Sequence, residues 1–184
     1  MKRTLFVLLA AAALPSVAAA QSPAEEIARA VLAAPANMRA EATVLKLQPD
    51  GQTTVLRQVS NGLICWDNRG RAGYDNAIDV QCTTEANRAR LEQNHAVQAE
   101  GGSEDEVNAR FARLDQQGTR AQSVFGSIYY HVMGADMNSL RTHTTVAVPN
   151  ATGAQLGLPE ARAAGMLWLM EAGSSSAHLM VSGM

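Results

Sequence analysis

Two cysteines, Cys65 and Cys82, constrain the fold of this chain more than any other feature of its sequence. They are the only cysteines in 184 residues, and an even pair in an oxidising compartment is most simply a disulfide. The bridge closes a loop of about 17 residues, which corresponds to about 3 kcal/mol of stabilisation in the chain-entropy description. The alternative, a redox-active pair, usually has Cys-x-x-Cys spacing. We therefore expect a structural disulfide that holds the polar stretch between the two cysteines against the body of the protein.

The oxidising compartment is predicted from the N-terminus. Lys2 and Arg3 begin the chain, an apolar run covers residues 5–14, and small residues at 18–20 precede Gln21. This order is typical of a secretory signal peptide, and the apolar run is too short to span a membrane. We expect cleavage after residue 20, no membrane span, and a periplasmic or secreted product.

Length and charge limit the remaining possibilities. Residues 21–184 number 164 (184 minus 20), which suits a single domain. Removal of Lys2 and Arg3 changes the formal net charge from −2 to −4, and no basic block is present. A nucleic-acid partner is therefore not expected.

The helix signals are concentrated in two regions. A first helix is predicted from Ser22, a capping residue followed by Pro23, to a stop at Pro35. After the second cysteine, Thr84–Gln98 has a thin apolar stripe, and Ser103 with Glu106 forms a capping box for a helix that ends near Gln117. A further short helix is predicted over Pro159–Ala164.

The strand signals also form two groups. Residues 41–66 are predicted to form a three-stranded antiparallel meander, because Asn61-Gly62 is a strong hairpin signal. The predicted strands are Glu41–Leu47, Thr53–Ser60, Leu63–Trp66, Gly126–Met133, Thr142–Val148, Met166–Glu171 and Ala177–Ser182. This order predicts one α+β domain, with an antiparallel sheet of about six strands, about three flanking helices and one disulfide.

Two stretches carry a resemblance. The first contains Leu56-Arg57, Asn61-Gly62 and Cys65, and the second runs from Ala172-Gly173 into Ala177–Val181. Together with the leader they resemble a group of uncharacterised secreted proteobacterial proteins, which have an Asn-Gly-x-x-Cys hairpin and a C-terminal Ala-His-Leu-Met strand. The resemblance implies secretion and carries no activity with it.

Three of the four histidines fall in predicted C-terminal strands. Side chains alternate along a strand, so His131, His143 and His178 share one face if the aliphatic residues of each strand face the core. Three imidazoles could form an open zinc or copper site. The further ligands available are Met180, Met133, Asp136 and Glu171. The alternative is that these histidines are separate or bonded within the fold, since no His-x-His or His-Glu-x-x-His spacing occurs.

No catalytic or cofactor fingerprint is present. The serines at 174–176 precede His178, but Gly-x-Ser-x-Gly is absent and a turn is the simpler interpretation. Methionines are frequent near the C-terminus; they can bind copper(I), although they more often fill a core. We therefore expect a non-catalytic, envelope-associated protein that binds an unidentified protein or small ligand. The alternative is a periplasmic metal-binding protein or metalloenzyme that uses His131, His143 and His178.

Overall fold

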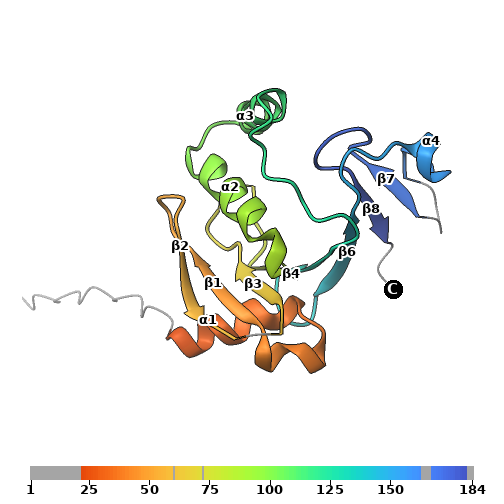
Figure 1. The fold of residues 1–184 in the computed structure, drawn as a ribbon. Helices are drawn as coiled ribbons and strands as arrows, with labels where there is room; N and C mark the ends of the chain where they lie inside the picture. Colours follow the sequence, from red (N-terminus) through yellow and green to blue (C-terminus); the bar gives the residue numbers. More distant parts are fainter. Residues whose placement is uncertain (1–21, 60, 72, 163–166, 182–184) are drawn as a thin grey trace, which may run out of the picture.

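An eight-stranded mixed sheet forms the frame of the protein, with strand order β2-β1-β3-β4-β5-β6-β8-β7 (Figure 1). The computed structural model describes residues 22–59, 61–71, 73–162 and 167–181, so the predicted signal peptide lies outside the described residues. The strands are β1 Thr43–Leu47, β2 Thr53–Arg57, β3 Leu63–Asp67, β4 Ile78–Thr84, β5 Ile128–Gly134, β6 Arg141–Ala147, β7 Trp168–Met170 and β8 His178–Val181. The α-helices of the described residues are α1 Pro23–Ala30, α2 Arg88–Ala99, α3 Glu104–Gln116 and α4 Gly153–Leu156. Short 3₁₀ helices occupy Val31–Ala33 (η1), Ala36–Glu41 (η2) and Glu85–Asn87 (η3).

The predicted three-stranded meander is wrong. β1 lies between its two neighbours, antiparallel to β2 and parallel to β3, so the sheet is mixed. The four residues from Leu63 to Trp66 are all buried, as in a strand whose two faces are both covered, and β3 lies inside the sheet between β1 and β4. The half-exposed β2 takes the edge instead. Asn61 does not form a hairpin turn between β2 and β3, since these strands are not paired. Its side-chain amide donates a hydrogen bond to the Met38 carbonyl, and its Oδ1 accepts one from the Leu63 amide.

The sheet is also larger than the predicted six strands. β4 occupies Ile78–Thr84, part of which was predicted to be a loop held down by the disulfide. Asp79 and Gln81 interrupt the hydrophobic pattern, but Ile78, Val80 and Cys82 face the core on the α1 side. β4 pairs with β3 and β5 and so connects the N-terminal and C-terminal strands.

The predicted capping residues are confirmed. Ser22 forms a capping box with Glu25 at the start of α1, and Ser103 forms one with Glu106 at the start of α3. The short helix predicted at Pro159–Ala164 is wrong for residues 159–162; residues 163 and 164 lie outside the described residues. The helix of this region, α4, begins earlier at a Thr152 capping box and ends at Gly157, which has a φ of 66°.

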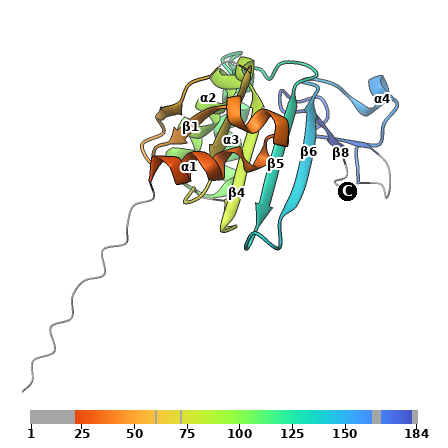
Figure 2. The same ribbon diagram turned by 90° about the horizontal axis from the view of Figure 1, so that it is seen from below.

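Two hydrophobic layers cover opposite faces of the sheet. On one face, α1 and η1 pack over a cluster that includes Val44, Cys65, Val80 and Val132 (Figure 2). On the other face, Leu91 of α2 packs on Leu45, Ile64 and Trp66. Leu91 of α2 lies toward the β1 and β3 end of that face, and the surface of β5, β6 and β8 beside it lines a pocket.

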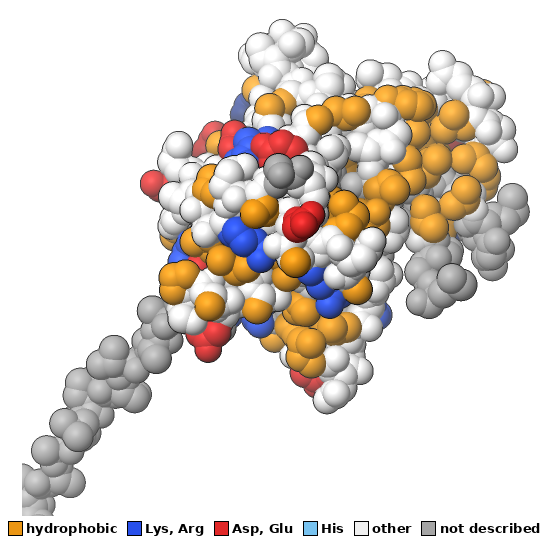
Figure 3. Space-filling view, turned by 60° about the horizontal axis from the view of Figure 1, so that its bottom comes forward, with side chains coloured by type: hydrophobic (Ala, Val, Ile, Leu, Met, Phe, Trp, Pro, Cys, Tyr) orange, Lys and Arg blue, Asp and Glu red, His pale blue; other side chains and the backbone are white. Residues whose placement is uncertain are grey.

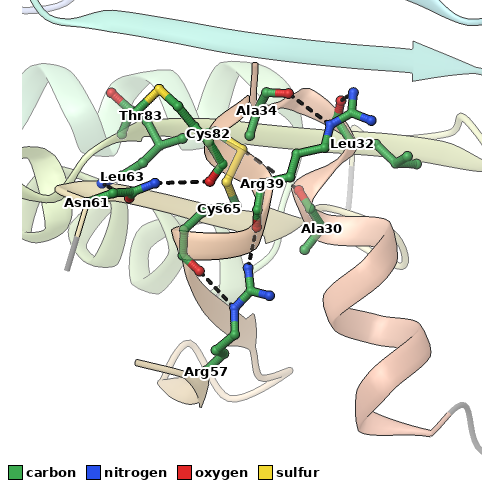
Figure 4. The surroundings of a disulfide bond; sticks show 12 residues. Ala30, Leu32, Ala34, Arg39, Arg57, Asn61, Leu63, Cys65, Cys82 and Thr83 are labelled. Atoms are coloured by element: carbon green, nitrogen blue, oxygen red, sulfur yellow. Dashed lines mark hydrogen bonds between the residues drawn. A yellow bond between two sulfur atoms is a disulfide. The ribbon is translucent and has the colours of Figure 1, made fainter. Parts of the chain in front are cut away.

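The predicted disulfide between Cys65 and Cys82 is confirmed (Figure 4). The two residues are direct partners on β3 and β4, their Cα atoms are 4.1 Å apart, and both are fully buried. The bridge therefore joins two central strands under α1 and does not fasten a loop to the surface.

No helix of the described residues is long and apolar enough to cross a membrane. Hydrophobic side chains gather on the surface around the C-terminal strands and α4 (Figure 3). Large hydrophobic side chains of this half of the chain are partly exposed, for example Ile128 of β5 at 38% and Leu156 of α4 at 37%.

Candidate functional site

Strand pairing places the three predicted histidines on one face of the sheet. His131 of β5 is the direct partner of His143 on β6, and His178 of β8 is paired with Ala147, four residues along β6 from His143. Side chains alternate along β6, so all three histidines point to the face that α2 partly covers. The shared face that strand alternation predicted is therefore present.

These histidines line a cavity of about 300 Å³, here called the histidine pocket. Its floor is the β5, β6 and β8 surface, and its walls come from α2, the segment before β5 and the β7–β8 connection. The lining residues are Gln81, Arg90, Asn94, Ser123, Tyr129, His131, His143, Thr145, Ala147, Glu171, Ser176, Ala177 and His178. The volume is at the lower end of the range for small-ligand sites.

A buried carboxylate orients His131. Asp79 is 2% exposed, and its Oδ1 lies 2.8 Å from His131 Nε2 and 2.9 Å from Asn68 Nδ2. Burial alone raises the pKa of Asp79, but hydrogen bonds from His131, Asn68 and Asn76 outweigh burial and lower it. Since an ionised carboxylate only accepts hydrogen bonds, His131 carries its proton on Nε2, and Nδ1 has a free lone pair when the ring is neutral.

The other two histidines have different partners. His143 Nε2 lies 3.3 Å from the thioether sulfur of Met180, and its ring centroid is 6.2 Å from that of His131. Burial, followed by repulsion from His131 and His178, lowers the pKa of His143. His178 donates from Nδ1 to the Ser176 carbonyl at 2.8 Å, which leaves its Nε2 as the acceptor in the neutral ring.

Arg90 brings a buried positive charge to the pocket wall. It is 4% exposed, and its guanidinium donates to the Ala121 carbonyl at 2.7 Å and to the Ser175 and Ser176 hydroxyls at 3.3 and 2.5 Å. All of these partners are neutral, and among the described residues no carboxylate lies within ion-pair distance of Arg90. Burial lowers the pKa of Arg90, as expected for a cation removed from water.

A second buried arginine, Arg120, interacts with Arg90. Arg120 is 5% exposed, donates to the side-chain oxygens of Gln93 and Asn94, and stacks on Phe111. Burial, followed by repulsion from Arg90, lowers the pKa of Arg120 to about 10. No ion pair to Arg120 is present in the described part of the chain. Glu171 is the acidic residue of the pocket lining, and its side chain is exposed at the rim.

Some of the other residues considered as ligands or catalysts lie at the pocket, and others lie away from it. Met180 contacts His143, and Glu171 lines the pocket. Met133 and Asp136 do not line it; the Asp136 carboxylate accepts the Asn138 and Ser139 amides in the β5–β6 turn. Ser175 and Ser176 accept hydrogen bonds from Arg90, and the contact between Ser176 and His178 uses the Ser176 carbonyl, as suits a turn.

The three histidines do not form a complete metal site by themselves. Across the described ranges, no three side chains of His, Cys, Asp or Glu converge closely enough to hold a metal ion. A metal-binding role for His131, His143 and His178 therefore stays a prediction.

Sequence reasoning missed Arg90 and Asp79. Arg90 sits on a predicted polar helix, where an arginine ordinarily faces solvent, and Asp79 was placed in a loop. The available signal for Asp79 was the alternation Ile78-Asp79-Val80-Gln81-Cys82, which is typical of a strand with one polar face.

Comparison with known proteins adds no further assignment. No protein family matches this chain, and no significant match was found among curated proteins or solved structures. The fold and the pocket define the class of protein: an α+β protein with a mixed sheet, a buried disulfide and a polar pocket rich in histidine and arginine.

Proposed function

We propose that this is a non-catalytic binding protein of the cell envelope or the secreted fraction, and that it holds a small anionic ligand in the histidine pocket. The observation that carries the proposal is the buried guanidinium of Arg90, which has only neutral partners. A buried charge without a direct ion-pair partner is costly, and an anion entering the pocket would offset that cost.

The shape and chemistry of the pocket support this ligand class. Carboxylate and phosphate groups match the planar donor fork of arginine. The hydroxyls of Tyr129 and Ser123, which lie 3.1 Å apart, and the Asn94 amide supply further hydrogen-bonding groups. A volume of about 300 Å³ suits a small carboxylate or phosphate better than a polymer.

The compartment is part of the proposal. Support comes from the buried disulfide, which is stable in an oxidising environment, and from the signal-peptide pattern of residues 1–20. The resemblance to uncharacterised secreted proteobacterial proteins points to the same compartment.

Thermal unfolding with defined anions tests the proposal. The probes are acetate, succinate, phosphate and sulfate at constant ionic strength, with glucose as the neutral control. A ligand that binds the native state raises the melting temperature as its concentration rises. We expect at least one anion to do so, and glucose to have no effect.

A matched pair of variants locates the binding site. Arg90→Gln should abolish the anion-dependent rise, whereas Arg113→Gln, which removes an exposed arginine on α3, should retain it. If Arg90→Gln does not fold, ring NMR signals of His131 and His178 in the parent protein supply the second measurement, because an anion in the pocket must shift them. An unchanged melting temperature with all four anions, or a rise that Arg90→Gln retains, contradicts the proposal.

A further inference from the structure

One contact at the edge of the histidine pocket is unexplained by anion binding: the approach of His143 to Met180. Met180 lies on β8, directly opposite Thr145 of β6, so its side chain shares the histidine face. Its sulfur is 3.3 Å from His143 Nε2. This places a soft thioether donor and an imidazole nitrogen next to each other at the edge of the pocket.

The spacing of these two atoms fits a shared metal ion. At the distances typical of zinc sites, about 2.0 Å to nitrogen and about 2.3 Å to sulfur, atoms 3.3 Å apart enclose a metal at an angle of about 100°. Such an angle is close to tetrahedral, so the distance between the two atoms is compatible with both binding one ion.

His131 is the candidate for a third donor. It is the cross-strand partner of His143, with the ring centroids 6.2 Å apart. Its Nε2 bonds to Asp79, so the free lone pair is on Nδ1. A carboxylate behind the distal nitrogen is the usual outer-shell arrangement of metal-binding histidines, because it holds the ring and raises its basicity.

We propose that His143, Met180 and His131 bind a single copper(I) ion at the edge of the histidine pocket, with Asp79 as a positioning residue. A thioether is a soft donor, which suits copper(I) and does not suit calcium or magnesium. Both cysteines are joined in the disulfide, so no thiolate of this chain competes for the ion. The contact between His143 and Met180 carries this proposal independently of Arg90 and of anion binding.

Competition for copper(I) under anaerobic conditions tests the site. The purified protein, with its disulfide intact, is titrated against the copper(I)–bicinchoninate complex. The parent should remove one copper(I) per chain, and Met180→Leu, which nearly preserves side-chain volume, should weaken binding by about tenfold or more. Met137→Leu is the matched control, because Met137 is 59% exposed in the β5–β6 turn and does not line the pocket.

Two further readouts separate this proposal from the previous one. X-ray absorption of the copper-loaded parent should show one sulfur neighbour that Met180→Leu lacks, and both variants should melt near the parent temperature without copper. Arg90→Gln should lose the anion response and keep copper(I). The proposal is overturned if the parent holds no stoichiometric copper(I), if Met180→Leu binds it as tightly, or if the copper has no sulfur neighbour.

Discussion

At the scale of single residues, the pocket depends on charged groups that the fold removes from water. Asp79 is compensated by three hydrogen-bond donors, whereas Arg90 has only neutral acceptors. A satisfied buried carboxylate supports the structure, while a buried cation without a counter-ion is a cost that function can explain. Burial of Asp79 therefore stabilises the fold, whereas burial of Arg90 lowers stability and points to a ligand.

His143 makes the stability of the protein sensitive to mild acid. Its pKa in the folded state is lowered, so the unfolded chain takes up the proton first, near the ordinary histidine value of about 6.5. The free energy of unfolding should therefore fall as the pH decreases below about 6.5. Urea unfolding between pH 7.5 and 5.5 measures this fall, which should be smaller in His143→Gln.

His178→Gln is the control for that measurement. It removes a histidine of the same pocket and leaves His143 buried. Burial is the main cause of the lowered pKa of His143 and repulsion from His178 a smaller one, so most of the acid-dependent fall should persist. An equal fall in His143→Gln and the parent protein would contradict the expected role of His143.

At the scale of elements, local signals in the sequence predicted helix starts, but they did not predict which strands pair. The capping boxes at Ser22 and Ser103 act within one turn, so the sequence contains all of their partners. The position of β3 depends on neighbours far along the chain: it pairs with β1 in parallel and with β4 across the disulfide. The helix starts could therefore be predicted, whereas the meander could not.

The Ser103 cap should contribute measurably to stability. Ser103→Ala removes the hydroxyl that accepts the Glu106 amide, and should lower the free energy of unfolding by about 1 kcal/mol. Urea unfolding at pH 7 provides the value. Ser103→Asp keeps a side-chain acceptor at the cap and should recover most of the loss; equal losses in the two variants would show that the cap contact is unimportant.

The disulfide should contribute more to the free energy of unfolding than any helix cap. The double variant Cys65→Ala/Cys82→Ala should lower the free energy of unfolding by about 3 kcal/mol, because the bridge restricts a 17-residue loop in the unfolded chain. Denaturant unfolding of the oxidised parent and the double variant gives the difference. A loss below about 1 kcal/mol would mean that pairing of β3 with β4 holds this region without the covalent bond.

At the scale of the whole molecule, β4 and β5 connect two groups of strands into one sheet. The C-terminal strands have their own small core, which contains Leu169 at 0% exposure together with Val148 and Ala177. The histidine pocket lies where this group meets α2, so its geometry depends on both groups holding their relative position. Residues 21–184 are accordingly predicted to unfold as one cooperative unit.

A substitution at one end of the sheet tests this cooperativity at the other. Leu169→Ala should cost about 2–5 kcal/mol. In a Trp168→Phe background, Trp66 is the remaining tryptophan and reports on the β3 end. Its fluorescence transition in urea should move to lower concentration with Leu169→Ala.

Leu167→Ala is the control, because Leu167 is 42% exposed and its loss should change little. An unchanged Trp66 transition in Leu169→Ala would mean that β7 and β8 unfold separately, and would contradict the single-domain prediction.

The sequence by itself determined what depends on near neighbours: the helix caps, the α+β class, the cysteine pair, and the alternation that places His131, His143 and His178 on one face. Tertiary structure alone decided the strand order, the parallel pairing of β1 and β3, and the presence of β4 in the centre of the sheet. It also placed Arg90 beside the histidines and Met180 beside His143. The physical reason is that hydrogen bonds within a turn and alternation along a strand act over a few residues. The choice of partner strand and the burial of a charge depend instead on segments far apart in the chain.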